Sequence, residues 1–156
     1  MTNYNFRWRW GETNPIITPV DASTVIHRGD LLWFNTSSKK AEPASTSSFG
    51  ASLSAAQTTF TPNFLGIAMQ ESPAGNDSPI RVATTGTFQF NKTGAEVTLG
   101  SLVGVDDNSD ASALENQTLV PVSSKTQALG RVSHIMDVEP GTVYVTITSS
   151  VMCGGC

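Results

Sequence analysis

The sequence has few charged residues. Asp, Glu, Lys and Arg make up 14% of its 156 residues, with a formal net charge of −4, whereas the usual charged share is about 25%. Ser, Thr, Asn and Gly take their place, and these residues suit strands and turns better than long helices. Without a basic excess, the chain has no overall positive field to attract nucleic acid or anionic lipid. We therefore expect neither nucleic acid nor membrane among its partners.

Long hydrophobic runs are also missing. No stretch approaches the roughly 20 apolar residues that a membrane span requires. The start of the chain lacks the apolar segment of a secretory signal peptide. The length fits a single domain with a substantial core. These features predict one soluble domain that does not use the general secretory route.

Cysteine is scarce, and its only two occurrences, Cys153 and Cys156, lie in the terminal CGGC. Two cysteines make no disulfide framework. Redox CxxC motifs open a helix, and a single CxxC supplies only two of the four ligands of a structural zinc site. Three interpretations stay open: a flexible tail, an intermolecular disulfide or shared metal between subunits, and a redox site.

Catalytic signatures are absent from the sequence: it has no GxSxG, GxxxxGK[ST], GxGxxG or HExxH. His27 and His134 occupy comparable strand-adjacent places in the two halves, each without a metal-ligand partner. The run 106–110 has oxygen-bearing side chains at alternate positions, as an EF-hand loop does, but Ala111 and Gln117 stand where that loop needs Gly and Glu. We expect no enzyme, no cofactor and no metal site.

What the sequence does contain is a series of short segments rich in Val, Ile, Thr and aromatic residues, bounded by turn residues. These segments are 4–10, 24–35, 58–70, 79–91, 95–106, 117–122, 128–138 and 142–152. Short helices are predicted only at 50–57 and 109–116, and loops at 36–52, 71–79 and 106–116. The pattern predicts an all-β fold, a small β-barrel or sandwich with extended terminal segments. We divide the chain into an N-terminal arm or first strand (1–19), a β domain (20–149) and a flexible C-terminal tail (150–156).

The two halves of the β domain repeat one pattern. Residues 25–35 match 97–106 around Gly29 and Gly100, residues 64–68 match 128–132 around Gly66 and Gly130, and residues 80–83 match 143–146. Gly29 and Gly100 are expected in turns that lead into strands. Gly66 and Gly130 lie within apolar runs, where a bulge or close backbone approach is typical. The repeat predicts a body built from two related β units.

The first ten residues alternate aromatic and polar side chains, as an interface strand would. The predicted interface residues are Tyr4, Phe6, Arg7, Trp8, Arg9 and Trp10. In a regular strand the aromatic side chains would share one face and the arginines the other. Three interpretations stay open: the first strand of the chain's own core, an arm added to a neighbouring subunit or partner sheet, and a stacking surface for single-stranded nucleic acid. The acidic remainder of the chain opposes the third.

The order of a Gly-Asp-Leu-Leu turn, an LGIA segment and a valine-alternating strand resembles the small head decoration (capsid cement) proteins of tailed phages. The segments that carry this resemblance are Val25–Phe34, Phe64–Met69, Ile80–Phe90, Val97–Val105 and Leu129–Val132, within residues 20–148. The resemblance implies a β-rich protein, often trimeric, that binds the major capsid protein on the outer surface of the virion head and stabilises the shell. The aromatic N-terminus and the CGGC tail match no motif of that family.

A rival class is a carbohydrate-binding or tail-associated β module. Exposed tryptophans stack on sugar rings, and Trp8, Trp10 and Trp33 are the candidates for such contacts.

Overall fold

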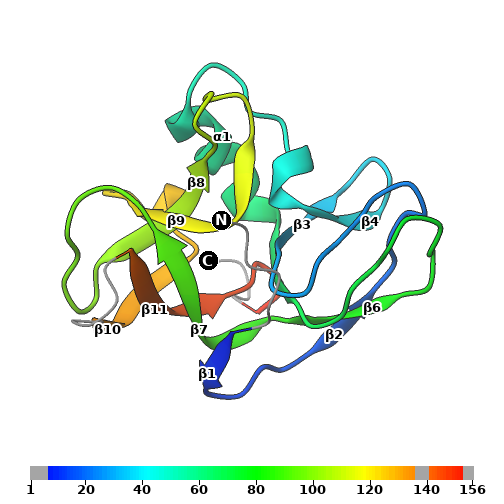
Figure 1. Ribbon diagram of the computed structural model, residues 1–156, viewed down its shortest axis with the longest axis horizontal. Coiled ribbons are helices and arrows are strands. Elements are labelled where there is room, and N and C mark those ends of the chain that lie inside the picture. Colours follow the sequence, from blue (N-terminus) through cyan, green and yellow to red (C-terminus); the bar gives the residue numbers. More distant parts are fainter. Residues whose placement is uncertain (1–6, 136–140, 153–156) are drawn as a thin grey trace.

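The computed structural model describes residues 7–135 and 141–152. Strands dominate this part of the chain, and its one α-helix, α1 (Leu53–Phe60), is short. The 3-10 turns are η1 (Ala44–Thr46), η2 (Thr61–Asn63) and η3 (Lys125–Gln127). The all-β prediction is confirmed. Figure 1 shows two β lobes side by side, with α1 at the top between them.

The left-hand lobe of Figure 1, here called unit 2, is a closed five-stranded barrel. Its strands, in order around the ring, are β7 (Thr85–Lys92), β11 (Thr142–Thr148), β10 (Gly130–Ile135), β8 (Leu102–Asp107) and β9 (Leu114–Pro121). Neighbours pair antiparallel except at the closure, where β9 runs parallel to β7 and Asn91 lies opposite Thr118. A short strand, β1 (Trp8–Trp10), pairs with β7 as an addition to this ring.

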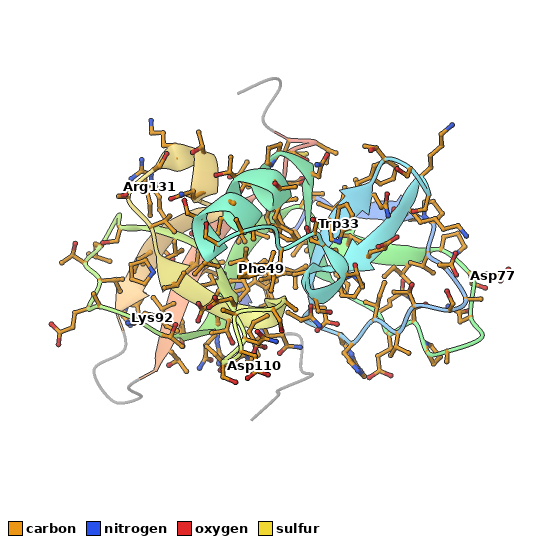
Figure 2. All side chains as sticks on the ribbon, turned by 90° about the horizontal axis from the view of Figure 1, so that it is seen from above. Trp33, Phe49, Asp77, Lys92, Asp110 and Arg131 are labelled. Atoms are coloured by element: carbon orange, nitrogen blue, oxygen red, sulfur yellow. The ribbon has the colours of Figure 1, made fainter. Side chains whose placement is uncertain are left out.

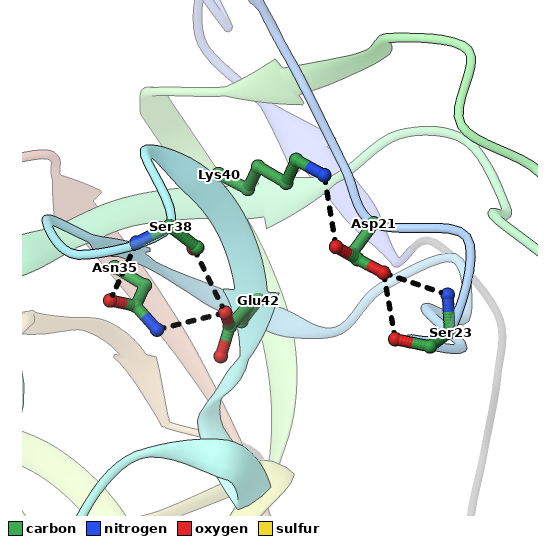
Figure 3. Close-up of polar contacts among 6 residues, drawn as sticks. All are labelled: Asp21, Ser23, Asn35, Ser38, Lys40 and Glu42. Atoms are coloured by element: carbon green, nitrogen blue, oxygen red, sulfur yellow. Dashed lines mark hydrogen bonds and ion pairs between the residues drawn. The ribbon is translucent and has the colours of Figure 1, made fainter.

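The other lobe, unit 1, is a sheet whose two edges meet. Its strands, in order, are β2 (Ile16–Thr18), β6 (Ile80–Ala83), β5 (Phe64–Ala68), β3 (Leu31–Asn35) and β4 (Lys40–Pro43). The Ala41 amide of β4 donates to the Pro19 carbonyl, which follows β2, at 2.9 Å. Beside it, Lys40 binds the Asp21 carboxylate at 2.9 Å (Figure 3). The two edge strands of unit 1 are therefore fastened to each other.

The Asp21 carboxylate is well positioned for this contact. It accepts hydrogen bonds from the backbone amide and the hydroxyl of Ser23, at 2.9 and 2.7 Å. These bonds, followed by the Lys40 ammonium, hold the pKa of Asp21 well below its usual range. Because both side chains of the pair are partly exposed to solvent, its contribution to stability is small.

Matching hydrogen bonds confirm that the units are related. The Gly29 amide donates to the Ala68 carbonyl at 2.8 Å, and the Gly100 amide donates to the Val132 carbonyl at the same distance. Both glycines have positive φ, 95° and 84°, in the turns that lead into β3 and β8. The turns predicted at these two glycines are thus present, in one geometry.

Strand register repeats as well. Leu32 of β3 lies opposite Gly66 of β5, as Val103 of β8 lies opposite Gly130 of β10. Outside these strands, β4 corresponds to β9 and β2 corresponds to part of β7. The prediction of two related β units is confirmed, each unit being five-stranded in its own right.

Two hydrophobic clusters fill the molecule. The smaller one lies inside unit 1, around Val20, Leu32 and Val82. The larger one fills unit 2 and continues across the junction to Phe60 and Phe64 of unit 1. Asp77 of unit 1 and Arg131 of unit 2 lie at opposite ends of the molecule, and Trp33 lies near its middle (Figure 2). Burial of the outer face of unit 1 against unit 2 joins the lobes into one body.

Several local predictions were wrong. Residues 36–52, predicted as a loop, contain β4 and η1, because β4 pairs along β3 despite its polar sequence. Residues 109–116 form a turn that leads into β9 and no helix, because the Asn108 side chain accepts the Ser112 amide at 3.0 Å. The helix predicted at 50–57 is α1, three residues further on, where the Ser52 hydroxyl caps it. The strand predicted at 58–70 is reduced to β5 by this helix.

Candidate functional site

The N-terminal strand β1 forms the outer edge of the β7 sheet. The Gln89 amide of β7 donates to the Arg7 carbonyl at 3.0 Å, and Trp8 lies opposite Phe88. Both tryptophans of β1 remain about half exposed, Trp8 at 46% and Trp10 at 45%. The segment thus pairs within its own chain, yet keeps large apolar surface in contact with solvent.

A group of aromatic rings surrounds Tyr144 on the outside of unit 2. Trp10 meets the Tyr144 ring edge-on, with ring centroids 5.5 Å apart. The His134 ring of β10 is tilted against the same ring, with ring centroids 5.3 Å apart. The Arg9 guanidinium lies 5.4 Å from the ring centroid and donates to the Gln89 side-chain oxygen. We call Arg9, Trp10, His134 and Tyr144 the outer aromatic surface. Trp8, on the same strand, donates through its indole N–H to the Gly11 carbonyl at 3.0 Å.

The regular alternation predicted for this stretch is wrong over β1. The strand register shifts between Trp8 and Trp10, so that these residues face Phe88 and Thr87 in turn. Such a bulge turns consecutive side chains to the same side. Arg9 and Trp10 therefore both contact Tyr144 and do not point in opposite directions.

Of the other predicted interface residues, Arg7 donates to the Asn91 side-chain oxygen at 3.4 Å and is half-buried. Tyr4 and Phe6 lie outside the described residues, as do Cys153 and Cys156. The structure therefore brings together Arg9 and Trp10 of the predicted set, leaves Trp8 exposed on the same strand, and adds two residues that sequence reasoning did not select, Tyr144 and His134. Their only sequence signal was a position on the outward side of a predicted strand.

The acidic run 106–110 covers the end of β8 and the hairpin turn that follows it. Asp106 accepts the Thr93 hydroxyl and the Asp107 amide. Partial desolvation, and then the neighbouring Asp106 charge, raise the pKa of Asp107. No group of three His, Cys, Asp or Glu side chains among the described residues is arranged to hold a metal ion. The run is a bonded turn at one end of unit 2.

Two further predictions, an exposed Trp33 and comparable places for His27 and His134, do not match the structure. Trp33 donates through its indole N–H to the Pro43 carbonyl at 3.2 Å and packs against the larger core, so it is no exposed platform for a sugar. His27 and His134 are not equivalent: the repeat places Thr98 where unit 1 has His27, since the same turn follows each. His134 lies on β10, within the outer aromatic surface.

One buried polar contact was missed. Asp30, in the turn before β3, is fully buried, and its carboxylate accepts the His27 amide at 2.8 Å and the Gln117 side-chain amide at 3.0 Å. Because Gln117 belongs to β9, this contact links unit 1 to unit 2. Burial raises the pKa of Asp30, and the hydrogen bonds from Gln117 and His27 oppose that shift. At the equivalent position unit 2 has a serine, Ser101.

Comparisons of the chain with protein-family models, with curated proteins and with solved structures found no match. Among the described residues, no helix is long and apolar enough to cross a membrane. The resemblance to phage decoration proteins therefore stays a prediction.

Proposed function

We propose that this chain is a structural decoration protein that binds the outer surface of a tailed-phage head as a trimer and stabilises the shell. Its partners are the major capsid protein and further copies of itself. The proposal assigns it no catalysis, no cofactor, no nucleic acid and no membrane. It acts by adhesion alone.

The observation that carries the proposal is the outer aromatic surface. Tryptophan, tyrosine and arginine dominate the binding energy of protein interfaces. Here Arg9, Trp10 and Tyr144 lie together on the outside of a closed barrel, and Trp8 is exposed on the same strand. A barrel joined to a second sheet by a shared core is a stiff support for such a contact. On a repetitive shell, many such contacts add together.

The test is co-sedimentation of the purified protein with expanded, undecorated heads from the source phage. The wild type should pellet with the heads, and the double variant W8A/W10A should bind at least about tenfold more weakly, as expected when hot-spot aromatics are lost. The matched control is Leu99→Ala, which removes an even more exposed apolar side chain from the loop before β8. Equal binding by W8A/W10A and the wild type would show that the outer aromatic surface is not part of the interface with the head.

Oligomeric state is tested separately. One chain has a mass of 16.5 kDa, so a trimer requires a mass of about three times that value by light scattering after size exclusion. A single-chain mass on the shell-free protein, and again after dissociation from heads, would contradict the trimer.

The second candidate is carbohydrate binding, which the exposed rings of Trp10 and His134 beside the half-buried Tyr144 favour. Aromatic faces flanked by polar groups, such as Gln89 and Arg9, are able to stack against sugars. A glycan array distinguishes the two candidates: specific glycan binding that W8A/W10A abolishes, without head binding, would favour the carbohydrate-binding module.

A further inference from the structure

The repeat reveals an edge that is filled in one unit and open in the other. In unit 2, the β7 edge next to Phe88 and Gln89 carries β1. In unit 1, the corresponding edge belongs to β2, where Ile16 pairs with Val82 as Phe88 pairs with Val145. The part of the chain that the structure describes places no strand along this edge. Figure 1 shows β2 at the lower rim of unit 1, beside β6.

The backbone of β2 is oriented to accept a strand there. Ile17 lies opposite Arg81 of β6, but the Arg81 amide donates to the Gln70 side chain at 2.7 Å and its carbonyl accepts the Met69 amide at 3.0 Å. Both groups of Arg81 therefore point away from β2. In an antiparallel pair the amide and carbonyl of Ile17 then point away from β6 as well, towards the open edge.

Pro19, two residues after Ile17, supports the outward orientation of the Ile17 amide and carbonyl, because alternate residues of a strand point their backbone groups the same way. The Pro19 carbonyl, two residues along, points outward and accepts the Ala41 amide of β4. Where β4 covers this edge, at Pro19, the outward carbonyl is thus hydrogen-bonded. At Ile17 nothing among the described residues covers them, and the Ile17 side chain is 71% exposed, the most exposed large apolar side chain there. An uncovered edge of this kind is a template for β-strand addition.

Charge indicates what kind of strand fits. In unit 2 the Arg9 side chain contacts Gln89 and lies over the Tyr144 ring. When the two units are matched by strand register, Ile17 of unit 1 corresponds to Gln89 of unit 2. Arg81, opposite Ile17, corresponds to Tyr144, opposite Gln89. A strand with arginine at that point, such as β1 of another copy, would set two guanidinium groups against each other. A carboxylate there would meet the exposed Arg81.

We propose that the β2 edge at Ile17 binds an extended segment of a partner protein by antiparallel strand addition, with an acidic side chain against Arg81 and an apolar side chain over Ile17. This site is distinct from the outer aromatic surface. It stands whether or not the partner is a phage shell.

The test uses two acetylated, amidated hexapeptides, TVTEVT and TVTKVT, titrated into the ¹⁵N-labelled full-length protein and followed by amide chemical shifts. Shifts should centre on the amides of residues 16–18 and of Arg81. The charge contact reaches across β2 to Arg81, as the Arg9 side chain reaches across β7 to Tyr144, and should make TVTEVT bind about threefold more tightly than TVTKVT. Shifts centred on residues 8–10, or no shifts at millimolar peptide, would overturn the proposal.

Two variants sharpen this test. Arg81→Glu should reverse the preference in favour of TVTKVT, whereas Arg131→Glu, the same charge change on the exposed side of β10, should leave it unchanged. Ile17→Pro removes an amide that β6 does not use, so the fold should persist while peptide binding is lost. If Arg81→Glu keeps the wild-type preference, or if folded Ile17→Pro binds as well as the wild type, the proposal is wrong.

Discussion

Gly66 and Gly130 occupy equivalent places in the two units, and each lies against the carbonyl of a neighbouring strand. A Cβ atom at Gly66 would collide with the Ala83 carbonyl oxygen, and one at Gly130 with the Thr146 carbonyl oxygen. The close approach anticipated at these glycines is therefore present, and it is the same in both units. It lets β5 lie tightly along β6, and β10 along β11.

Alanine at either position should destabilise the fold. Forcing a methyl group into a packed site costs about 1–3 kcal/mol, so urea unfolding of Gly66→Ala and Gly130→Ala should show a lower midpoint for each. At Gly66 the positive φ of 143° adds conformational strain. Gly100→Ala is the control, because it has a positive φ but no atom within 4 Å of the added Cβ. It should cost about 1 kcal/mol; equal losses in all three variants would contradict the steric explanation.

A buried side-chain amide ties helix α1 to unit 2. The Gln57 side chain is buried and donates to the Val105 carbonyl of β8 at 2.7 Å. Gln57→Ala leaves that carbonyl unpaired in the core, so the free energy of unfolding should fall by about 1–3 kcal/mol. Thr58→Ala, on the exposed side of the same helix, is the matched control. If thermal or urea unfolding shows the same loss for both variants, helix propensity and not this contact is responsible.

The parts of the fold that could be predicted from the sequence are those governed by local pattern. Turn glycines, alternating apolar residues and the echo around Gly29 and Gly100 led directly to two β units. β4 was missed because its sequence, KAEP, has no strand signature and is held by pairing with β3. Pairing across a sheet is a tertiary effect that outweighs local propensity.

The candidate site could likewise be predicted only as far as local sequence pattern governs it. The alternation at residues 8–10 predicted a strand, and β1 is one. It did not reveal the bulge, the neighbour β7 or the contact with Tyr144, because those depend on residues about 80 to 130 positions away. The Asp30 and Gln117 contact was equally hidden, since nothing in a Gly-Asp pair indicates that its carboxylate becomes buried.

Buried Asp30 should make stability depend on pH. Its pKa is raised by burial, so the folded state binds its proton more tightly than the unfolded state does. Stability from this group is complete below the ordinary carboxyl pKa and is lost as the pH rises through the raised folded value. The expected result is a fall in the free energy of unfolding across the mildly acidic range, measured by urea unfolding at a series of pH values.

Asp30→Asn provides the comparison for this prediction. The amide has no charge to lose, so the difference in stability between wild type and variant should change with pH in the same range and be constant above it. The variant should also lose a hydrogen bond, because His27 and Gln117 donate to different oxygens of Asp30 and the Asn side chain puts an NH2 group, which cannot accept, in place of one of them. Parallel pH profiles for the two proteins would show that Asp30 is ionised alike in both states.

Removal of residues 1–12 separates the two remaining interpretations of the N-terminal strand. The ring of unit 2 closes through β7 and β9 without β1, and Trp8 and Trp10 are half exposed, so the shortened chain should still fold. Residue Thr13 is kept because its carbonyl accepts the Thr84 amide at 2.9 Å. The thermal unfolding of the shortened chain should remain cooperative. A modest loss of stability is expected from exposing Thr87 and Gln89, which are buried in the full-length chain. Head binding or self-association should be lost in the same preparation. A shortened chain that is unfolded by circular dichroism would instead make β1 an obligatory part of the chain's own fold, and the aromatic residues would then be retained for stability and not for adhesion.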